Sequence, residues 1–417
     1  MKFVSLFTGL GGLDVGFVRA GAKALYANDV DQHAVAALNA NHSNLSECSV
    51  DHDDIRNLSA AKIENRSSAR RGDVDLIVGG PPCQSWSSAG RQRGLQDPRG
   101  QLVLDYIRIA NELDVRWLVF ENVRGLLTAR GPEGNPGGAL QHFRNLMLKH
   151  GFQTTVQLLN AADYGVPQRR VRLIIIGYRA GDEPSFPEPT HSKNPDEGLN
   201  KFAWVSLREC LAELEPITED EIIRPSASLA TQLAALPDGT GVRSAGKRET
   251  TRPGGHWGYK QGAFIAAQNL PARTVTASSQ QDWVRDPVYG LRKLTPRECA
   301  AIQSFPKDWK IPGSRAVKYR LIGNAVPPLL AERVAEALFK HSTQFDHRML
   351  DLDQGRHQEL LPLPNRLSQA IEYTIRDNMK NGESRISASQ SPDGRGMGRG
   401  NERQSQVRKG SHRSLQA

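Results

Sequence analysis

The chain has 417 residues, 38% of them hydrophobic, and carries a formal net charge of +9. A chain of this length and composition buries a sizeable core and favours two domains over one. Its 4 cysteines are widely spaced, which excludes paired zinc or redox cysteines, so we expect no metal site.

The N-terminus and the hydropathy predict a cytoplasmic protein. Residues 1–20 lack the basic start and long apolar run of a signal peptide, and Asp14 interrupts their apolar stretch. No segment approaches the roughly 18 apolar residues of a membrane span, so we expect no membrane contact and reduced thiols. The positive excess favours a polyanionic partner, although ribosomal and phosphate-binding proteins share it.

Apolar runs alternate with helical patterns through the first 180 residues. Strands are predicted at residues 3–7, 24–27, 75–78, 117–120, 154–159 and 172–176, and helices at residues 11–19, 32–41, 102–113 and 138–150. In the second helix, Val35, Ala36 and Leu38 are expected to point inward. Strands that alternate with helices predict an α/β domain whose parallel sheet is covered on both faces.

The alternation ends near residue 180. Residues 181–270 are rich in Pro, Gly and Ser, with short helical signals, and are interpreted as a second, smaller and irregular domain. Helices at 295–304 and 329–341 return the chain to the first domain over residues 271–341, the former with Thr295 as cap. Residues 342–417 form an extension whose composition predicts disorder from about residue 380.

The first candidate site is a nucleotide-type cofactor loop. The strand at residues 3–7 leads into Thr8-Gly9-Leu10-Gly11-Gly12 and then a helix, so glycines allow close approach and the helix offers free N–H groups. Asp29 follows the second strand, where an acid accepts hydrogen bonds from ribose. The spacing departs from G-x-G-x-x-G, which disfavours NAD and favours S-adenosylmethionine, although ordinary turn residues give the same pattern.

The second candidate site is a cysteine at the end of a strand. Cys83 follows Gly79-Gly80-Pro81-Pro82, and the two prolines stiffen a platform where α/β sites usually lie. A lone cysteine is more often a small buried hydrophobe, but this setting favours a reactive thiol. Glu121, at the end of the next strand, is either a solvated turn residue or a proton donor with a raised pKa beside Cys83.

A basic segment precedes the strand at residues 172–176. Arg170 and Arg172 alternate in Gln168-Arg169-Arg170-Val171-Arg172, so both side chains are expected on the same side of an extended segment. They form either a solvated basic edge or a site for phosphate or a polarised carbonyl.

Together these segments resemble the bacterial DNA (cytosine-5) methyltransferase family over residues 2–340, with the motifs in the family's order. The most specific is Gly79-Gly80-Pro81-Pro82-Cys83-Gln84-Ser85. The others are Phe7-Thr8-Gly9-Leu10-Gly11-Gly12, Glu121-Asn122-Val123, Gln168-Arg169-Arg170-Val171-Arg172, Leu270-Pro271-Ala272-Arg273-Thr274-Val275-Thr276, Arg297-Glu298, Gln303-Ser304-Phe305-Pro306 and Gly323-Asn324-Ala325-Val326-Pro327-Pro328.

The resemblance implies a Rossmann-like sheet that uses S-adenosylmethionine, with a target recognition domain at residues 181–270. Cys83 would attack carbon 6 of a flipped cytosine, Glu121 would bond to its N3 and exocyclic amine, and carbon 5 would be methylated. Arg172 would hold the carbonyl oxygen, and Arg170 would shape the same site. The implied cofactor residues are Phe7, Gly9, Gly11, Gly12, Asp29, Asp54, Ile55, Pro81, Asn324 and Val326, with Asp53 as an alternative to Asp54 at the adenine.

The resemblance also implies the partners. Double-stranded DNA would contact Ser85, Ser87, Arg91, Arg93 and Arg273, with residues 90–99 as a mobile loop. A monomer is expected, in the bacterial cytoplasm and bound to the nucleoid through DNA, and paired with a restriction endonuclease encoded nearby. The basic residues of the tail would either add sequence-independent phosphate attraction or have no function. Candidate base-reading residues are Arg243, Lys247, Arg248, Arg252 and Lys260.

Two other classes remain open. An RNA cytosine-5 methyltransferase that acts on tRNA would share Cys83 and Glu121, but the Cys-Phe-Thr tripeptide typical of that branch is absent. A catalytically dead DNA-binding relative would usually lack the nucleophile or the acid, and this chain has both.

Overall fold

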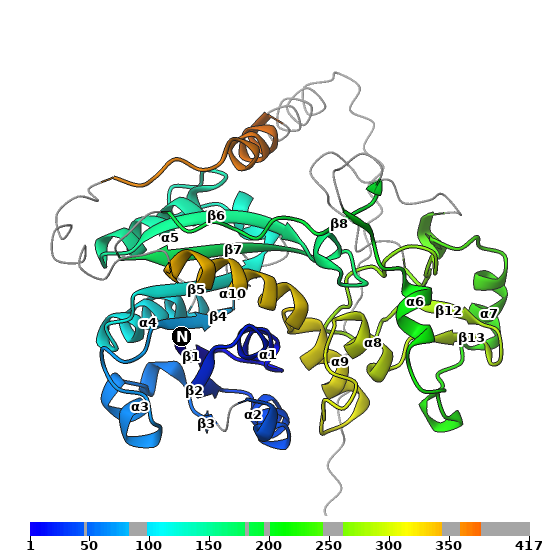
Figure 1. Ribbon diagram of the computed structural model, residues 1–417. Coiled ribbons are helices and arrows are strands. Elements are labelled where there is room, and N and C mark those ends of the chain that lie inside the picture. The colour runs from blue at the N-terminus through cyan, green and yellow to red at the C-terminus, as the bar shows by residue number, and fades with distance from the viewer. Residues whose placement is uncertain are drawn as a thin grey trace, which may run out of the picture. The chain divides into compact units, whose positions relative to one another are not determined.

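A seven-stranded sheet in the order β3-β2-β1-β4-β5-β7-β6 forms the centre of the protein (Figure 1). The computed structural model describes residues 1–45, 48–82, 98–179, 183–195, 201–244, 262–343 and 359–376. The strands are β1 (Lys2–Leu6), β2 (Lys23–Asp29), β3 (Ser49–His52), β4 (Leu76–Gly79), β5 (Trp117–Val123), β6 (Gln153–Asn160) and β7 (Val171–Tyr178). The predicted α/β fold class is confirmed.

Helices cover both faces of this sheet. One face carries α1 (Gly12–Arg19), α2 (Gln32–Ala40), α8 (Pro296–Ile302), α9 (Arg315–Asn324) and α10 (Pro328–Thr343), and the other α3 (Ala60–Arg66), α4 (Pro98–Glu112) and α5 (Gly138–Lys149). Each face therefore has its own apolar core. Within the described ranges, no helix is long and apolar enough to cross a membrane.

The sheet differs from the prediction in the direction of one strand. The strands from β3 to β5 are parallel, but β7 runs antiparallel to both β5 and β6. The connection from β6 to β7 is short and contains one 3-10 turn (Ala161–Tyr164), and antiparallel neighbours need no long crossover. The expectation of a wholly parallel sheet was wrong.

Two further predictions need correction. In α2 the buried residues are Ala34, Ala37 and Leu38, a helical i, i+3, i+4 stripe, so Val35 and Ala36 do not point into the core. Strand β5 also continues three residues beyond the predicted strand. Glu121 therefore lies within the strand rather than after it.

The region between β7 and α8 is irregular, as its composition predicts. It contains β8 (His191–Ser192), β9 (Phe202–Ala203), α6 (Leu207–Ala212), α7 (Ala227–Ala234), β10 (Thr240–Gly241), β11 (Phe264–Ile265), β12 (Trp283–Asp286) and β13 (Gly290–Lys293). The last four strands form one sheet in chain order around a small core of Leu233, Ile265 and Trp283. This sheet joins strands on both sides of residue 270.

Part of the C-terminal extension returns to the large sheet. Residues 359–376 belong to the described chain, and most of them lie in the compact unit Met1–Thr374. The side chain of Gln153 in edge strand β6 donates to the carbonyl of Glu359 (3.0 Å), and the helix at residues 365–376 buries Leu367. The extension thus contacts the first residue of edge strand β6 and adds Leu367 to the apolar core on one face of the sheet. The part predicted to be disordered, from about residue 380, lies outside the described residues.

Candidate active site at the carboxyl edge of the sheet

The loop between β1 and α1 has the conformation expected of a ligand-binding turn. Phe7, Gly9 and Gly11 have φ angles of 56°, 57° and 82°, in the left-handed region. The Asp29 carboxylate, at the end of β2, accepts hydrogen bonds from the backbone N–H groups of Gly9 (2.8 Å) and Asp31 (2.8 Å). Burial raises the pKa of Asp29. The structure thus brings the predicted glycine loop and the predicted ribose acid together.

The same loop meets the last motif of the chain. A Cβ atom on Gly12 would lie 1.9 Å from the carbonyl oxygen of Val326, so only glycine fits there. Asn324 ends α9 with an exposed side chain, and α1 packs along α10. Residues more than 300 positions apart therefore line one edge, as predicted for the cofactor site.

The acidic residues after β3 are engaged in ion pairs. Asp53 pairs with Lys62 (2.5 Å), and Asp54 pairs with Arg56. These partners hold the pKa of each carboxyl below its usual range. The side chain of Ile55 is 3% exposed and packs in the core beneath them. Ile55 therefore presents little side-chain surface to any ligand.

Glu121 lies beside the turn that precedes Cys83. Strand β4 pairs with β5 so that Gly79 is opposite Phe120, and a Cβ atom on Gly80 would lie 2.9 Å from Oε2 of Glu121. The side-chain amide of Asn122 donates to the carbonyl of Pro81 (3.2 Å). The turn at residues 79–82 therefore packs against the end of β5. Cys83 itself lies outside the described residues, as do Ser85, Ser87, Arg91 and Arg93.

The environment of Glu121 raises the pKa of its carboxyl. The residue is buried, and Nε of Arg172 lies 2.7 Å from its Oε1. Burial raises the pKa of the carboxyl, while the charges of Arg172 and Arg170 act in the opposite direction. The ion pair between Glu121 and Arg172 was not predicted from the sequence, which assigned the two residues separate roles.

Arg170 and Arg172 have different partners. The fully buried Arg170 guanidinium donates to the carbonyls of Val275 (3.1 Å), Gly323 (2.8 Å) and Ala325 (2.8 Å). It holds together segments that lie far apart in sequence. Arg172, by contrast, contacts the acid itself, so the two arginines do not share one role.

The segment around Arg273 braces the irregular region. Arg273 pairs with Asp282 (2.8 Å), and its guanidinium lies 3.6 Å from the centroid of the Phe264 ring. The backbone N–H of Arg169 donates to the carbonyl of Ala272 (2.8 Å). Arg273 was predicted to bind DNA, but its guanidinium is engaged within the protein.

The described cysteines are unsuited to nucleophilic chemistry. Cys48, Cys210 and Cys299 are free and buried. Burial raises the pKa of Cys48 and of Cys210 to about 12, and it also raises the pKa of Cys299 well above its usual value. A thiol needs its thiolate form to react, so these three are structural.

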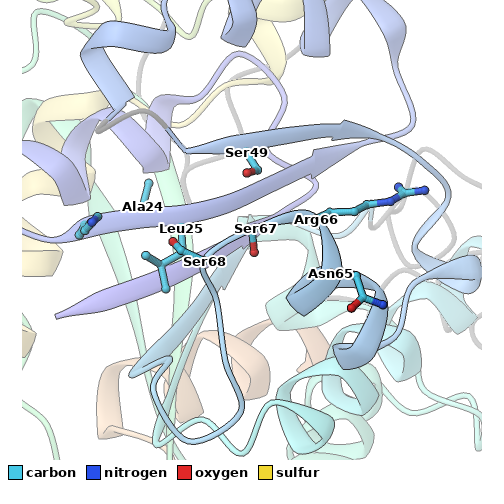
Figure 2. A pocket seen from close by; sticks show the side chains of 8 residues that line it. Ala24, Leu25, Ser49, Asn65, Arg66, Ser67 and Ser68 are labelled. Carbon is cyan, nitrogen blue, oxygen red and sulfur yellow. The ribbon is translucent and has the colours of Figure 1, made fainter.

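A polar pocket of about 490 Å³ lies at the opposite edge of the sheet (Figure 2). Its walls come from the amino ends of β2 and β3 and from the end of α3. The lining residues are Lys23, Ala24, Leu25, Ser49, Asn65, Arg66, Ser67 and Ser68. Sites of α/β proteins lie at the carboxyl ends of the strands, and this lining contains no predicted site residue. The pocket is therefore not the active site.

Asp14 contacts the predicted glycine loop and was not among the residues singled out from the sequence. It is fully buried in the first turn of α1, and its Oδ2 accepts a hydrogen bond from the Thr8 hydroxyl (2.7 Å). Burial raises the pKa of this carboxyl to about 6. A single acid within an otherwise apolar helix was the available signal.

Replacing Asp14 with asparagine should change how stability depends on pH. Because the folded-state pKa is raised from 3.8 to about 6, the contribution of this carboxyl to the free energy of unfolding is full below pH 3.8 and is lost as the pH rises through about 6. The free energy of unfolding of Asp14→Asn, taken relative to wild type at the same pH, should therefore rise by about 2 kcal/mol from pH 4.5 to pH 7.5. Urea unfolding at both pH values measures this gain, and a pH-independent difference would contradict it.

The Rossmann-like sheet, its glycine loop and the acid on β5 define a methyltransferase fold. A DNA modification methyltransferase encoded within an E. coli prophage superposes with a TM-score of 0.60 at 22% identity, over 82% of this chain and 99% of that chain. The S. pombe Dnmt2 methyltransferase gives a TM-score of 0.58 at 18% identity, over 83% and 100%. These two structural similarities support the assignment of the fold alone.

Sequence comparison identifies the family. The model for C-5 cytosine-specific DNA methylases matches residues 1–340. The type II methyltransferase M.NgoPII of Neisseria gonorrhoeae is 33% identical in an alignment of 362 positions that covers 82% of this chain and 96% of that relative. M1.HphI of Haemophilus parahaemolyticus, also a type II methyltransferase, is 31% identical over 82% of this chain and 88% of its own length. The chain belongs to the C-5 cytosine-specific DNA methylase family and is a DNA (cytosine-5-)-methyltransferase.

Proposed function

We propose that this enzyme methylates carbon 5 of one cytosine in a specific duplex DNA sequence, through a covalent bond to Cys83, as the modification enzyme of a type II restriction–modification system. The observation that carries the chemistry is the buried Glu121, which lies beside the Gly79–Gly80 turn and is paired with Arg172 at 2.7 Å. The biological setting rests on relatives that are named type II methyltransferases.

The proposed reaction assigns one step to each of three side chains. The Cys83 thiolate forms a bond to carbon 6 while Glu121 donates a proton to N3, so electron density accumulates at carbon 5. Arg172 donates to the carbonyl oxygen of the ring and orients Glu121. After methylation, N3 returns its proton to Glu121 and carbon 5 loses its proton to solvent. The double bond between carbons 5 and 6 re-forms as the bond between sulfur and carbon 6 breaks, and the Cys83 thiolate is released.

The cofactor edge fits S-adenosylmethionine, which supplies an electrophilic methyl group when bound. This cofactor has no pyrophosphate, so the loop needs none of the spacing of a dinucleotide site. Both Asp29 oxygens already accept one backbone N–H, and each retains a lone pair for a ribose hydroxyl. Phe7, Asn324 and Val326 lie at the same edge and would complete the site.

Base recognition is assigned to the irregular region at residues 181–270. Specific recognition requires side chains that reach base edges in a groove, whereas phosphate contacts only position the protein. Among the candidate readers, Arg243 lies in the described chain, and Lys247, Arg248, Arg252 and Lys260 lie outside it. Because the small sheet joins strands on both sides of residue 270, the transferable unit extends to Lys293.

Exchanging residues 183–293 for the equivalent segment of a relative with a different target should move the methylated sequence and preserve methyl transfer. This exchange keeps the four strands of the small sheet together and leaves Glu121 and Arg172 untouched. Bisulfite sequencing of DNA from cells that express each protein measures the outcome. Methylation at the original sequence would place readout elsewhere, and labelled methyl transfer to tRNA but not to duplex DNA would overturn the DNA assignment.

A further inference from the structure

Arg124 is a half-buried cation that has no partner among the described residues. It begins the 3-10 turn η4 (Arg124–Thr128) directly after the last residue of β5, on the same sheet edge as Glu121. Within the part of the chain that the structure describes, no hydrogen bond, ion pair or ring contact engages its guanidinium. The proposed reaction gives this residue no role.

Comparison with two other desolvated arginines shows what Arg124 lacks. Burial lowers the pKa of Arg124, Arg144 and Arg179 alike. The guanidinium of Arg144 donates to the carbonyl of Leu361 (2.6 Å), and that of Arg179 donates to the carbonyl of Val115 (2.9 Å). A desolvated charge without such acceptors costs folding free energy. This cost is offset when an anion binds Arg124.

Among the described residues, no carboxylate pairs with Arg124, and its chain neighbour Val123 offers apolar surface. Val123 is opposite Arg172 in the β5–β7 register, so Arg124 follows directly on the strand pair that holds Glu121 and Arg172. Val123 itself is 36% exposed, which is unusual for a large apolar side chain in this protein. A guanidinium next to an exposed apolar side chain can bind a sugar–phosphate backbone.

We propose that Arg124 binds a backbone phosphate of the DNA strand that carries the target cytosine. The proposal rests on the proposed function, because only a nucleic-acid substrate brings a phosphodiester to this edge. Arg124 is a positioning residue: it fixes the strand beside Glu121 and takes no part in proton or methyl transfer.

The test compares Arg124→Gln with Arg124→Lys. The control is Arg333→Gln in α10, which removes the same charge from a residue that pairs with Glu336. Duplex binding is measured over a series of salt concentrations. Arg124→Gln should weaken binding about tenfold at low salt and reduce the slope of log K against log salt by about 1, since one phosphate contact is lost. Arg124→Lys should restore most of the slope, and Arg333→Gln should leave it unchanged.

Two further measurements separate this proposal from its alternatives. At saturating DNA, kcat should stay within about twofold of wild type, because the contact positions the substrate without entering the chemistry. The Kd for S-adenosylhomocysteine should not change; weaker binding of this ligand with an unaltered salt slope would mean that Arg124 holds the cofactor carboxylate, which overturns the proposal. An unaltered slope in folded Arg124→Gln and Arg124→Lys also overturns it. Wild-type methylation of duplex DNA, measured in parallel, tests the proposed function separately.

Discussion

Cys83→Ala is expected to reduce methyl transfer below detection while cofactor binding stays intact. Removal of the covalent nucleophile closes the low-barrier route, and the remaining cysteines cannot replace it. Cys48, Cys210 and Cys299 are buried, and burial raises their pKa. Transfer of tritiated methyl groups to duplex DNA measures the loss, and the Kd for S-adenosylhomocysteine measures the integrity of the cofactor site.

The matched control is Cys210→Ala, which removes a thiol from the irregular region and should retain methyl transfer. Duplex DNA that contains 5-fluorocytosine should trap the wild-type enzyme, because fluorine at carbon 5 cannot leave as a proton does. The adduct should survive denaturing electrophoresis and map to Cys83. Turnover near the wild-type level in Cys83→Ala would refute covalent catalysis at this residue.

Glu121→Gln is expected to lower kcat by about 10²–10⁴-fold, the usual contribution of general acid–base catalysis. Glutamine keeps the size of the side chain and cannot supply a proton to N3. Because burial raises the pKa of Glu121, the wild-type carboxyl keeps its proton to a higher pH than an exposed glutamate does. The wild-type kcat should therefore fall as the pH rises through that pKa, and the residual rate of the variant should not follow this profile.

Single-turnover rates between pH 5 and pH 9 measure both effects. Glu213→Gln, at an exposed carboxyl near Lys307, is the control and should behave as wild type. DNA affinity should change little in either variant. Equal rates for glutamine and glutamate across the pH range would remove the proton-donor role from Glu121.

Local sequence patterns predicted the parts of the site that depend on strand ends. The run at residues 117–120 and the stop at Gly79–Gly80–Pro81–Pro82 identify two neighbouring strands, and neighbouring parallel strands place Glu121 beside the turn before Cys83. The glycine loop and Asp29 meet for the same reason. These predictions succeed because position along a strand fixes position along the sheet edge.

Features that depend on long-range packing could not be predicted from local patterns. Arg170 and Arg172 look equivalent in an extended segment, yet one binds backbone carbonyls and the other Glu121, because distant segments surround them differently. The direction of β7 and the burial of Asp14 likewise depend on neighbours far away in sequence. The packing of Leu367 in the extension was also beyond a composition-based prediction, since one apolar stripe in a polar segment is a weak signal.

The three carbonyls bound by Arg170 also determine when this part of the enzyme can fold during its synthesis. They lie 105, 153 and 155 residues after the arginine, so the ribosome releases Arg170 long before its acceptors exist. At typical elongation rates, Ala325 emerges roughly 8–30 s later, so the guanidinium does not have all three of these carbonyl acceptors until the end of that interval. The contact between Val326 and Gly12 can form only at the end of this interval. If this edge binds the cofactor as proposed, we expect a nascent chain to gain cofactor binding only after residue 326 has been made.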